Sequence, residues 1–297
     1  MGETLRRTWA VTGALAAVAA SSALAGAMPG ASAAAGQEPP QTRIVGGSEA
    51  DITEYPFTVY LADAQGAQFC GGTLVAADKV VTAAHCVADE QPDRIEVVAG
   101  RQDTRGEDGT VVGVTRIVTH PDYVGADQGA DIAVLDLAGV LAERTLPYAT
   151  GSDTALYEPG TSTTVLGWGA TSESGSPSTT LRRAHPPLTN DADCSKANPG
   201  YSPESMVCAG VPQGGVDSCQ GDSGGPLIAG DKLIGIVSWG NGCARPESPG
   251  VYTRVASYED FLRQHVGGPT VSPEVGDQEA GPVQEGPSNH AAGLIES

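Results

Sequence analysis

Residues 57–84, FTVYLADAQGAQFCGGTLVAADKVVTAA, contain three short apolar runs separated by turn-forming residues. The runs are FTVYLA, GGTLVA and KVVTAA, and each is shorter than an ordinary helix. Asp and Gly between the runs favour turns. Short runs with Val and Thr, bounded by such residues, predict β-strands that follow one another along the chain.

The same alternation of apolar runs and turns continues along most of the chain. RIEVVAG, TVVGVTRIVT and DIAVLDL complete a first β-module over about residues 44–145, and a looser stretch covers 138–159. A second module, over about residues 160–255, contains TSTTVLGWG, TTLRRAHPPL, MVCAGV, PLIAG, KLIGIVSWG and GVYTRV. This spacing predicts an all-β fold of sandwich or barrel type, built from two modules in tandem.

The composition fits a folded protein that does not bind polyanions. Of 297 residues, 40% are hydrophobic, which excludes a wholly disordered chain. Sixteen Lys and Arg stand against 36 Asp and Glu, a formal charge of −20. Such a balance argues against nucleic acid or an anionic membrane as partner and favours cationic substrates. The six cysteines fit disulfides if the chain is exported.

Residues 1–35 have the character of a secretory signal peptide. Arg6 and Arg7 precede an uncharged, Ala-rich run over residues 9–28, and residues 31–35 offer an A-x-A cleavage site. A membrane anchor is the alternative, since the run is about long enough to span a bilayer. The weak hydrophobicity and the cleavage site favour secretion, with no membrane association after the signal is removed. Residues 36–43, GQEPPQTR, are then a removable propeptide.

The C-terminal end divides into a helix and a tail. Tyr258, Phe261, Leu262 and His265 recur at helical spacing after Ser257, a candidate N-cap, which predicts a helix over 257–266. Residues 267–297 contain Gly, Pro, Ser, Gln and five acids, with no aromatic residue, Lys or Arg. Such a composition cannot bury a core and predicts a disordered acidic extension.

The densest chemical signal is DSCQGDSGGP at residues 217–226. Ser223 is flanked by glycines that let the backbone approach a substrate and direct N–H groups at a developing oxyanion. Residues 221–225 also match the nucleophile elbow of α/β-hydrolases. That alternative needs a helix after the serine, but Pro226 and Gly230 interrupt the next residues, and only His265 and His290 follow in the chain.

A nucleophilic serine needs a base and a third group that orients it. His85, in TAAHC at the end of an apolar run, is the candidate base, whereas His120 and His185 each precede a proline in loop sequence. Asp131 begins DIAVLDL, where a carboxylate is expected to be desolvated; Asp136, deeper in that run, is the competitor. Each residue alone also fits an ordinary structural role.

The order His85, Asp131, Ser223 is the order of the chymotrypsin-type triad. From residue 44 to about 266 the chain resembles the trypsin-like serine proteases, and it is similar in character to the secreted bacterial members. The resemblance rests on IVGG (44–47), CGGTL (70–74), TAAHC (82–86), DIAVL (131–135), GWG (167–169), DSCQGDSGGP (217–226), SWG (238–240) and PGVYTRV (249–255).

The resemblance implies two six-stranded antiparallel β-barrels with the active site between them. It implies that Ser223 is the nucleophile, His85 the general base and acid, and Asp131 the residue that orients His85. The N–H groups of Gly221 and Ser223 would form the oxyanion hole. These roles follow from the family resemblance, because the spacing of the residues alone does not assign them.

The resemblance also implies a specificity pocket. Asp217 would lie at its floor and pair with Arg or Lys, Gly240 and Gly250 would form open walls, and Ser238 would line the pocket and support Asp131. The implied disulfides are Cys70–Cys86, Cys194–Cys208 and Cys219–Cys243. Residues 101–111 match the calcium-binding loop of animal trypsins poorly, so we predict no metal site and no cofactor, with Asp103, Glu107 and Asp108 solvated.

Finally, IVGG at 44–47 resembles the mature N-terminus of this family. Cleavage between Arg43 and Ile44 would free an α-ammonium that pairs with Asp222 and orders the oxyanion hole, so the chain would be a zymogen. The expected partners are polypeptides with Arg or Lys before the cut bond and protein protease inhibitors, and the enzyme is expected to be a monomer.

A different class of function is a catalytically silent homologue that only binds. Such proteins lose a triad residue, and none is lost here.

Overall fold

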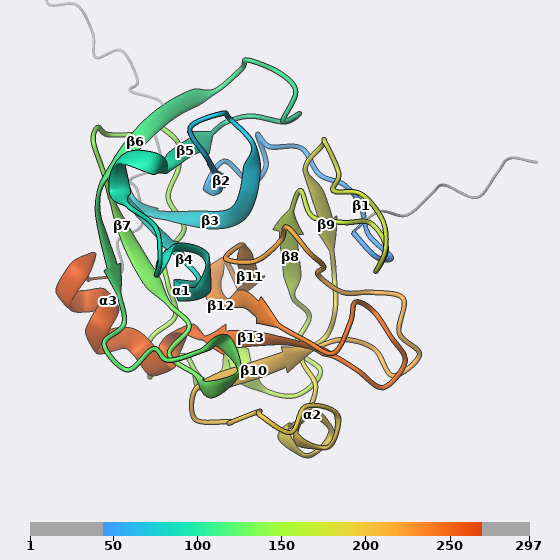
Figure 1. Cartoon of the computed structure of the whole chain (residues 1–297). Helices are drawn as coiled ribbons and strands as arrows, with labels where there is room; N and C mark the ends of the chain where they lie inside the picture. Colours follow the sequence, from blue (N-terminus) through green and yellow to red (C-terminus); the bar gives the residue numbers. More distant parts are fainter. Residues whose placement is uncertain (1–43, 269–297) are drawn as a thin grey trace, which may run out of the picture. The chain divides into compact units, whose positions relative to one another are not determined.

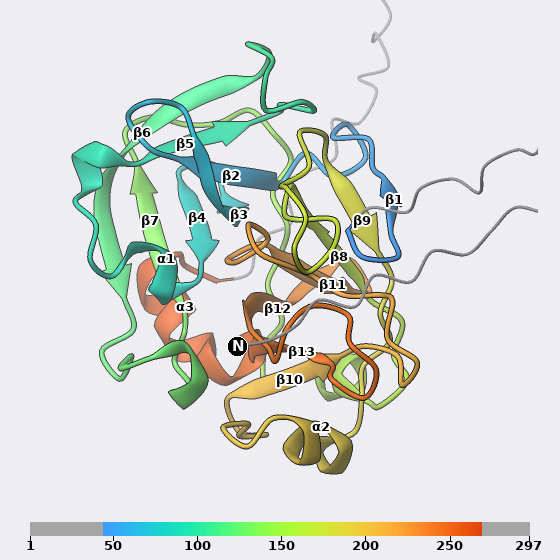
Figure 2. The same cartoon turned by 45° about the vertical axis from the view of Figure 1, so that its right-hand side comes forward.

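The computed structural model describes residues 44–268 (Figures 1 and 2). The predicted signal peptide, Arg43 with the rest of the propeptide, and residues 269–297 of the extension lie outside the described residues. The described chain contains mostly β-structure and few helices, which confirms the predicted all-β class. The strands are β1 (Ser48–Glu49), β2 (Thr58–Ala62), β3 (Gln68–Ala76), β4 (Lys79–Thr82), β5 (Glu96–Ala99), β6 (Thr110–Thr119), β7 (Ala133–Leu137), β8 (Thr164–Gly167), β9 (Arg182–Ala184), β10 (Met206–Ala209), β11 (Pro226–Ala229), β12 (Lys232–Trp239) and β13 (Gly250–Arg254).

The first module is a closed six-stranded antiparallel barrel in the order β2-β3-β4-β7-β6-β5. Its interior is filled by the Val, Leu and Ile side chains of the runs recognised in the sequence, with every residue of β2 buried. Gly72 in β3 faces this interior, where a Cβ atom would lie 2.7 Å from Val80 and 3.1 Å from Val59. The barrel therefore needs a glycine at this position.

The second module differs in detail from the predicted six-stranded barrel. It is a seven-stranded antiparallel sheet in the order β1-β9-β8-β11-β12-β13-β10. The additional strand, β1, comes from the N-terminal part of the chain and pairs with β9 through Ser48 and Arg183. An isolated bridge between Leu188 and Ala209 brings the segment after β9 to β10, so the sheet curls toward closure. Figures 1 and 2 show the barrel and this sheet side by side.

Three α-helices accompany the strands in the described range: α1 (Ala84–Val87), α2 (Asp191–Ala197) and α3 (Glu259–His265). The predicted C-terminal helix is present, although its first turn is a 3₁₀ helix over Val255–Tyr258 and Ser257 does not cap it. Phe261 and Leu262 of α3 belong to the large hydrophobic cluster that also contains the buried side chains of the first barrel. Helix α2 was not predicted; Asn190 caps it by accepting a hydrogen bond from the N–H of Asp193 at 2.8 Å.

The two modules are joined by backbone contacts between β3–β4 and the loop before β11. The N–H of Gly71 in β3 donates to the carbonyl of Ser223 at 2.7 Å. A Cβ on Gly224 would lie 2.2 Å from Thr82 Oγ1 and 3.2 Å from the backbone nitrogen of Ala83. These contacts set the serine loop directly against the segment that leads into α1. Within residues 44–268, no helix has the length and apolar character needed to cross a membrane.

Candidate active site

His85 and Asp131 are brought together by the short helix α1 and by the residues that precede β7. The carboxylate of Asp131 accepts two hydrogen bonds from the same residue: Oδ1 from the backbone N–H of His85 and Oδ2 from its Nδ1, both at 2.8 Å. The Asp131 side chain is only 1% exposed, whereas that of His85 is 26% exposed. Because a carboxylate oxygen accepts, Nδ1 carries the proton and Nε2 is left as the basic nitrogen.

The second sheet completes the surroundings of Asp131. Ser238 Oγ in β12 donates to Asp131 Oδ2 at 2.6 Å. Thr253 Oγ1 in β13 donates to the backbone carbonyl of Asp131 at 2.7 Å. The preceding residue, Ala130, has a φ of +54°, a conformation that is uncommon for a residue with a side chain. Its N–H donates to the hydroxyl of Tyr258 at 2.7 Å, which supports this strained backbone.

Ser223 lies on a loop in which nearly every backbone polar group is paired. Gly221 has a φ of +94°, so the loop needs a glycine there. The carbonyl oxygens of Gly221, Asp222 and Ser223 accept hydrogen bonds, and the N–H of Asp222 donates to the carbonyl of Cys219. Among the described residues, nothing accepts a hydrogen bond from the N–H groups of Gly221 and Ser223. These two groups are therefore available to an oxygen of a bound substrate.

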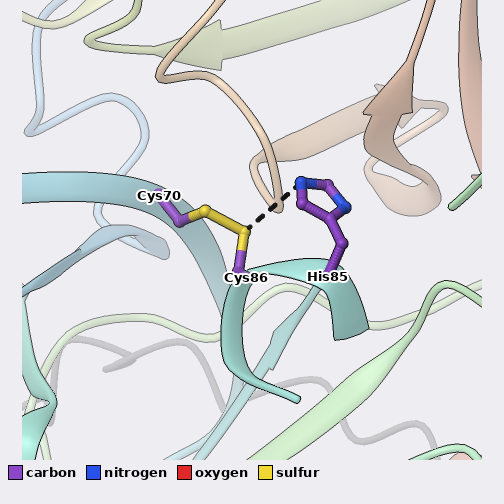
Figure 3. Close-up of side chains that lie close together, drawn as sticks. All are labelled: Cys70, His85 and Cys86. Carbon is purple, nitrogen blue, oxygen red and sulfur yellow. Dashed lines mark hydrogen bonds between the residues drawn. A yellow bond between two sulfur atoms is a disulfide. The ribbon is translucent and has the colours of Figure 1, made fainter. Parts of the chain in front are cut away.

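Ser223 and His85 belong to facing segments, but no hydrogen bond joins their side chains within the described range. His85 Nε2 instead lies 3.7 Å from Cys86 Sγ, one sulfur of the Cys70–Cys86 disulfide (Figure 3). Catalytic hydrogen bonds are often long in free enzymes and shorten when the substrate binds, so the missing bond does not exclude the pair from catalysis.

The same three residues, Cys70, His85 and Cys86, are the one grouping in residues 44–268 whose ligand atoms lie close enough for a metal ion. Both sulfurs are committed to the disulfide, so they offer no thiolate and the grouping is not a metal site.

A pocket of about 160 Å³ opens beside Ser223. Asp217 lines it together with Ser238, Gly240 and Gly250, so all four residues predicted from the sequence lie there. Asp217 is 2% exposed and accepts hydrogen bonds from the N–H of Ser218 at 2.8 Å and of Ala244 at 3.1 Å. Burial raises its pKa to about 7. A Cβ on Gly250 would lie 2.4 Å from Asp217 Oδ1, so only a glycine at this position leaves room for the carboxylate.

Asp222 is fully buried behind the serine loop. Its Oδ1 accepts from the N–H of Gly169 at 2.8 Å and its Oδ2 from the N–H of Cys219 at 2.9 Å. Burial raises its pKa to about 6. No Lys, Arg or His side chain of residues 44–268 forms an ion pair with it. A buried carboxylate without a cationic partner is costly once it ionises.

Val45, near the start of the described chain, packs against a residue that hydrogen-bonds to this carboxylate. Ile44 is fully buried, and Val45 packs against Ala170 and Cys219, the second of which donates its N–H to Asp222. The φ of Ile44 is +44°, which is rare for a β-branched residue.

A family model and several known proteins match this chain. The family model described as Trypsin matches residues 44–262. The chain belongs to the trypsin family. A trypsin from Saccharopolyspora erythraea is 50% identical over 223 residues, which are 75% of this chain and 98% of that protein. The vitellin-degrading protease of Bombyx mori is 44% identical over 234 residues, 75% of this chain and 86% of that protein. Trypsin eta of Drosophila erecta is 40% identical over 244 residues, which are 76% of this chain and 91% of that protein.

Membership of the trypsin family makes the protein a serine endopeptidase, a hydrolase of peptide bonds in polypeptides. The α/β-hydrolase alternative is excluded by the fold, since the strand β11 follows Ser223 where a nucleophile elbow requires a helix. Three disulfides join the pairs that the family resemblance implied, Cys70–Cys86, Cys194–Cys208 and Cys219–Cys243.

The competing residues of the trypsin-family domain lie elsewhere. His120 packs between the rings of Tyr258 and Phe261, and burial lowers its pKa. His185 is exposed and contacts Thr164. Asp136 forms an ion pair with Arg116 at 2.6 Å on the barrel surface.

Sequence patterns did not single out Gln68 or Asn198, although both touch the site. Gln68 Nε2 donates to the carbonyl of Gly221 at 2.8 Å. The buried amide of Asn198 bonds both to Asn241 and to the carbonyl of Pro249, which flank the pocket walls. Neither residue stands in a recognisable motif, and only the fold brings them to their partners.

Proposed function

We propose that the protein is a secreted zymogen whose active form cleaves polypeptides after Arg or Lys by a Ser223–His85–Asp131 mechanism. The observation that carries the specificity is that the buried Asp217 lines the same pocket as Ser223. A pocket with a buried carboxylate accepts a long cationic side chain and rejects a neutral one, which leaves the carboxylate unpaired.

In this mechanism Ser223 attacks the carbonyl carbon before the scissile bond. His85 takes the serine proton on Nε2 and later delivers it to the leaving amine. Asp131 keeps the imidazole in the tautomer with the proton on Nδ1 and stabilises the imidazolium that forms. The two hydrogen bonds between Asp131 and His85 support this role, because they fix both the position and the orientation of the ring.

The negative oxygen of the tetrahedral intermediate binds the N–H groups of Gly221 and Ser223. This role is supported by the hydrogen bonds of the surrounding loop: nearly all of its other backbone polar groups have partners, whereas these two N–H groups have no acceptor among the described residues. Preorganised donors of this kind stabilise developing charge without reorganising when the reaction occurs. Ser238 lines the pocket and its hydroxyl holds Asp131, so this residue links substrate binding to the position of the base.

Activation follows cleavage between Arg43 and Ile44. The new α-ammonium of Ile44 pairs with Asp222, the buried carboxylate that lacks a cation among residues 44–268. The positive φ of Ile44 supports this step, because cutting the preceding peptide bond removes the restraint that defines φ. Arg43 is itself a residue that Asp217 accepts, so the active enzyme can cut its own precursor.

The N-terminal composition supports export, as argued from residues 1–35. We expect a monomer, since the triad, the pocket and the activation residues all belong to one chain. Protein inhibitors that present Arg or Lys to the pocket are expected to bind it.

The deciding experiment compares matched Arg, Lys and Phe peptide amides as substrates of the cleaved protein. We expect hydrolysis of the Arg and Lys amides, and loss of activity when Ser223 is replaced by Ala. Preferential hydrolysis of the Phe amide would refute the pocket assignment. No hydrolysis of any amide by correctly cleaved, folded protein would favour a binding protein that has lost catalysis.

A further inference from the structure

The oxyanion-binding segment is held from the opposite barrel. Of the polar backbone groups in residues 221–223, the carbonyl of Gly221 accepts from Gln68 Nε2 at 2.8 Å and the carbonyl of Ser223 accepts from the N–H of Gly71 at 2.7 Å. Gln68 and Gly71 both belong to β3. One strand of the first module therefore anchors both ends of a tripeptide in the second module.

Gln68 differs from Gly71 because its contribution comes from a side chain. Within residues 44–268, it is the one residue whose side chain hydrogen-bonds to the backbone of residues 221–223. The half-buried amide can present either end, and the carbonyl of Gly221 selects the Nε2 end, since a carbonyl oxygen only accepts. Figure 3 shows Cys70, two positions further along β3, bonded to Cys86 beside His85, so this part of the strand is fixed next to the site.

Gly221 needs such a restraint more than its neighbours do. It has no Cβ and adopts a φ of +94°, and glycine has the largest conformational freedom of any residue. Asp222 is held by four hydrogen bonds, two to its carboxylate and two to its backbone.

The N–H of Gly221 belongs to the peptide unit of the Gln220 carbonyl, which accepts from the N–H of Ala170 at 2.7 Å. The carbonyl of Gly221 belongs to the next peptide unit, which Gln68 holds through this carbonyl and Cys219 holds through the N–H of Asp222. Gln68 therefore helps to fix the rotation between these two units at Gly221, and with it the angle between the N–H of Gly221 and the N–H of Ser223.

From this geometry we propose that Gln68 is a positioning residue: by holding the peptide unit between Gly221 and Asp222, it keeps the N–H of Gly221 and the N–H of Ser223 directed at the same substrate oxyanion. The proposal rests on the proposed function, in which Gly221 and Ser223 bind the oxyanion. Gln68 does not line the pocket of Asp217, and within residues 44–268 its side chain forms no hydrogen bond with His85 or Ser223. Its removal should therefore weaken interactions that exist only in the tetrahedral transition state, and should leave ground-state binding in the pocket unchanged.

The test uses the full chain cleaved after Arg43, with Gln68→Met as the main variant. Met keeps the length of the side chain and removes the donor. We expect kcat for an Arg amide to fall about five- to tenfold, the factor associated with one net hydrogen bond, with KM unchanged. The fall stays below the hundredfold or greater loss that deletion of an oxyanion donor itself causes.

Two inhibitors separate positioning from a general structural effect. A peptidyl-arginine aldehyde forms a tetrahedral adduct whose oxygen occupies the oxyanion site, whereas benzamidine fills only the pocket of Asp217. We expect Gln68→Met to raise Ki for the aldehyde about five- to tenfold and to leave Ki for benzamidine within about twofold. Gln68→His, which restores an N–H donor, should recover most of the aldehyde affinity. Gln65→Met, on the exposed loop before β3, is the matched control and should change neither constant.

The outcomes distinguish a failure of the proposed function from a failure of the positioning role of Gln68. If the unchanged enzyme does not hydrolyse Arg amides or bind the aldehyde, the proposed function fails. If the unchanged enzyme does both and Gln68→Met keeps the same kcat and aldehyde Ki, the function stands and the positioning role of Gln68 is refuted. A parallel loss of aldehyde and benzamidine affinity would likewise refute it, since that result indicates a disordered pocket.

Discussion

Ser238 Oγ donates a 2.6 Å hydrogen bond to Oδ2 of Asp131, the carboxylate oxygen that also lies 2.8 Å from His85 Nδ1. The backbone N–H of His85 occupies the other oxygen at 2.8 Å. Three donors thus compensate the burial of a carboxylate that is 1% exposed. The arrangement makes Asp131 a fixed acceptor, and the orientation of His85 follows from it.

Replacing Asp131 by Asn should abolish most activity and preserve the fold. The amide offers one acceptor and one donor, so it cannot satisfy both N–H groups of His85 and favours the wrong tautomer. We expect kcat to fall by roughly four orders of magnitude, as the same change does in the serine-protease triad generally. Asp136→Asn, in β7 five residues further along the chain and in a surface ion pair with Arg116, is the matched control and should keep full kcat. Equal kcat for the two variants would contradict the assignment of Asp131.

Replacing Asp217 by Ser should remove the preference for Arg and Lys. The variant loses the charge that pairs with the substrate cation. The transition state of an Arg amide should therefore be bound about 2–5 kcal/mol less tightly, measured as a fall in kcat/KM. A Phe amide should lose little, because it never made the pair. Asp260→Ser, at a position 99% exposed on α3, removes the same charge from the surface and should leave the Arg-to-Phe ratio unchanged. An unaltered ratio in Asp217→Ser would show that another group selects the substrate.

The fold was largely predictable from sequence because short strands carry a local signal. The apolar runs FTVYLA and DIAVLDL correspond to β2 and β7. Such strands are predictable because turn residues and β-branched residues within a few positions of each other are enough to indicate them. The pairing of β1 with β9 could not be predicted in this way. Ser48 and Glu49 are too few residues to show the alternation that predicts a strand, and their partner strand β9 is distant in the sequence.

Local charge patterns were a poorer guide to contacts than apolar runs. Asp103 was expected to be solvated; its side chain is 32% exposed and forms a surface ion pair with Arg105, whose hydrogen bonds lower its pKa to about 2. In the same loop, Arg101 reaches the carbonyl of Asp108 at 2.6 Å and the hydroxyl of Tyr60 at 3.1 Å. The same limitation applies to the site, since His85 and Ser223 stand in recognisable motifs whereas Gln68 acts through a partner 153 residues away.

Amidine binding should depend on the ionisation of Asp217. Burial raises the pKa of this carboxyl to about 7, and a bound amidinium favours the ionised form. The affinity of benzamidine should therefore be constant above pH 7. Below pH 7 it should fall as the pH falls, at a rate that approaches about tenfold per pH unit. Calorimetry on Ser223→Ala, which cannot turn over substrate, measures this directly, and Asp217→Asn should bind weakly at every pH. Undiminished affinity down to pH 5 would show that the carboxyl has an ordinary pKa.

The Ile44–Asp222 pair should appear as a difference in pH-dependent stability between cut and uncut chains. Burial raises the pKa of Asp222 to about 6, above its ordinary value of 3.8. A raised carboxyl pKa contributes stability that is present below the unfolded value and is lost as the pH rises through the folded one. In the uncut chain, ionisation above pH 6 leaves the carboxylate unpaired. In the cut chain, an α-ammonium, whose usual pKa is about 7.7–8.0, offsets that loss.

The precursor of residues 36–297 with Arg43→Gln should therefore lose more thermal stability between pH 5 and 7.5 than the same chain cut at Ile44. It should also remain nearly inactive toward an Arg amide, because no ammonium orders residues 221–223. If the precursor is as active as the cut enzyme, cleavage at Ile44 does not activate the protein.

Asp222→Asn, cut correctly at Ile44, isolates the charge pair from the cleavage itself. The amide keeps the size of the side chain but cannot pair with the ammonium, so the protein should fold and bind benzamidine weakly, with little hydrolysis. Because Asn can also disturb the hydrogen bonds from Gly169 and Cys219, the informative comparison is between the cut and uncut forms of this variant. We expect cleavage to leave its stability and activity nearly unchanged, whereas cleavage of the unmodified chain raises both. Full activation of the cut variant would refute the ammonium–carboxylate mechanism while leaving the triad assignment intact.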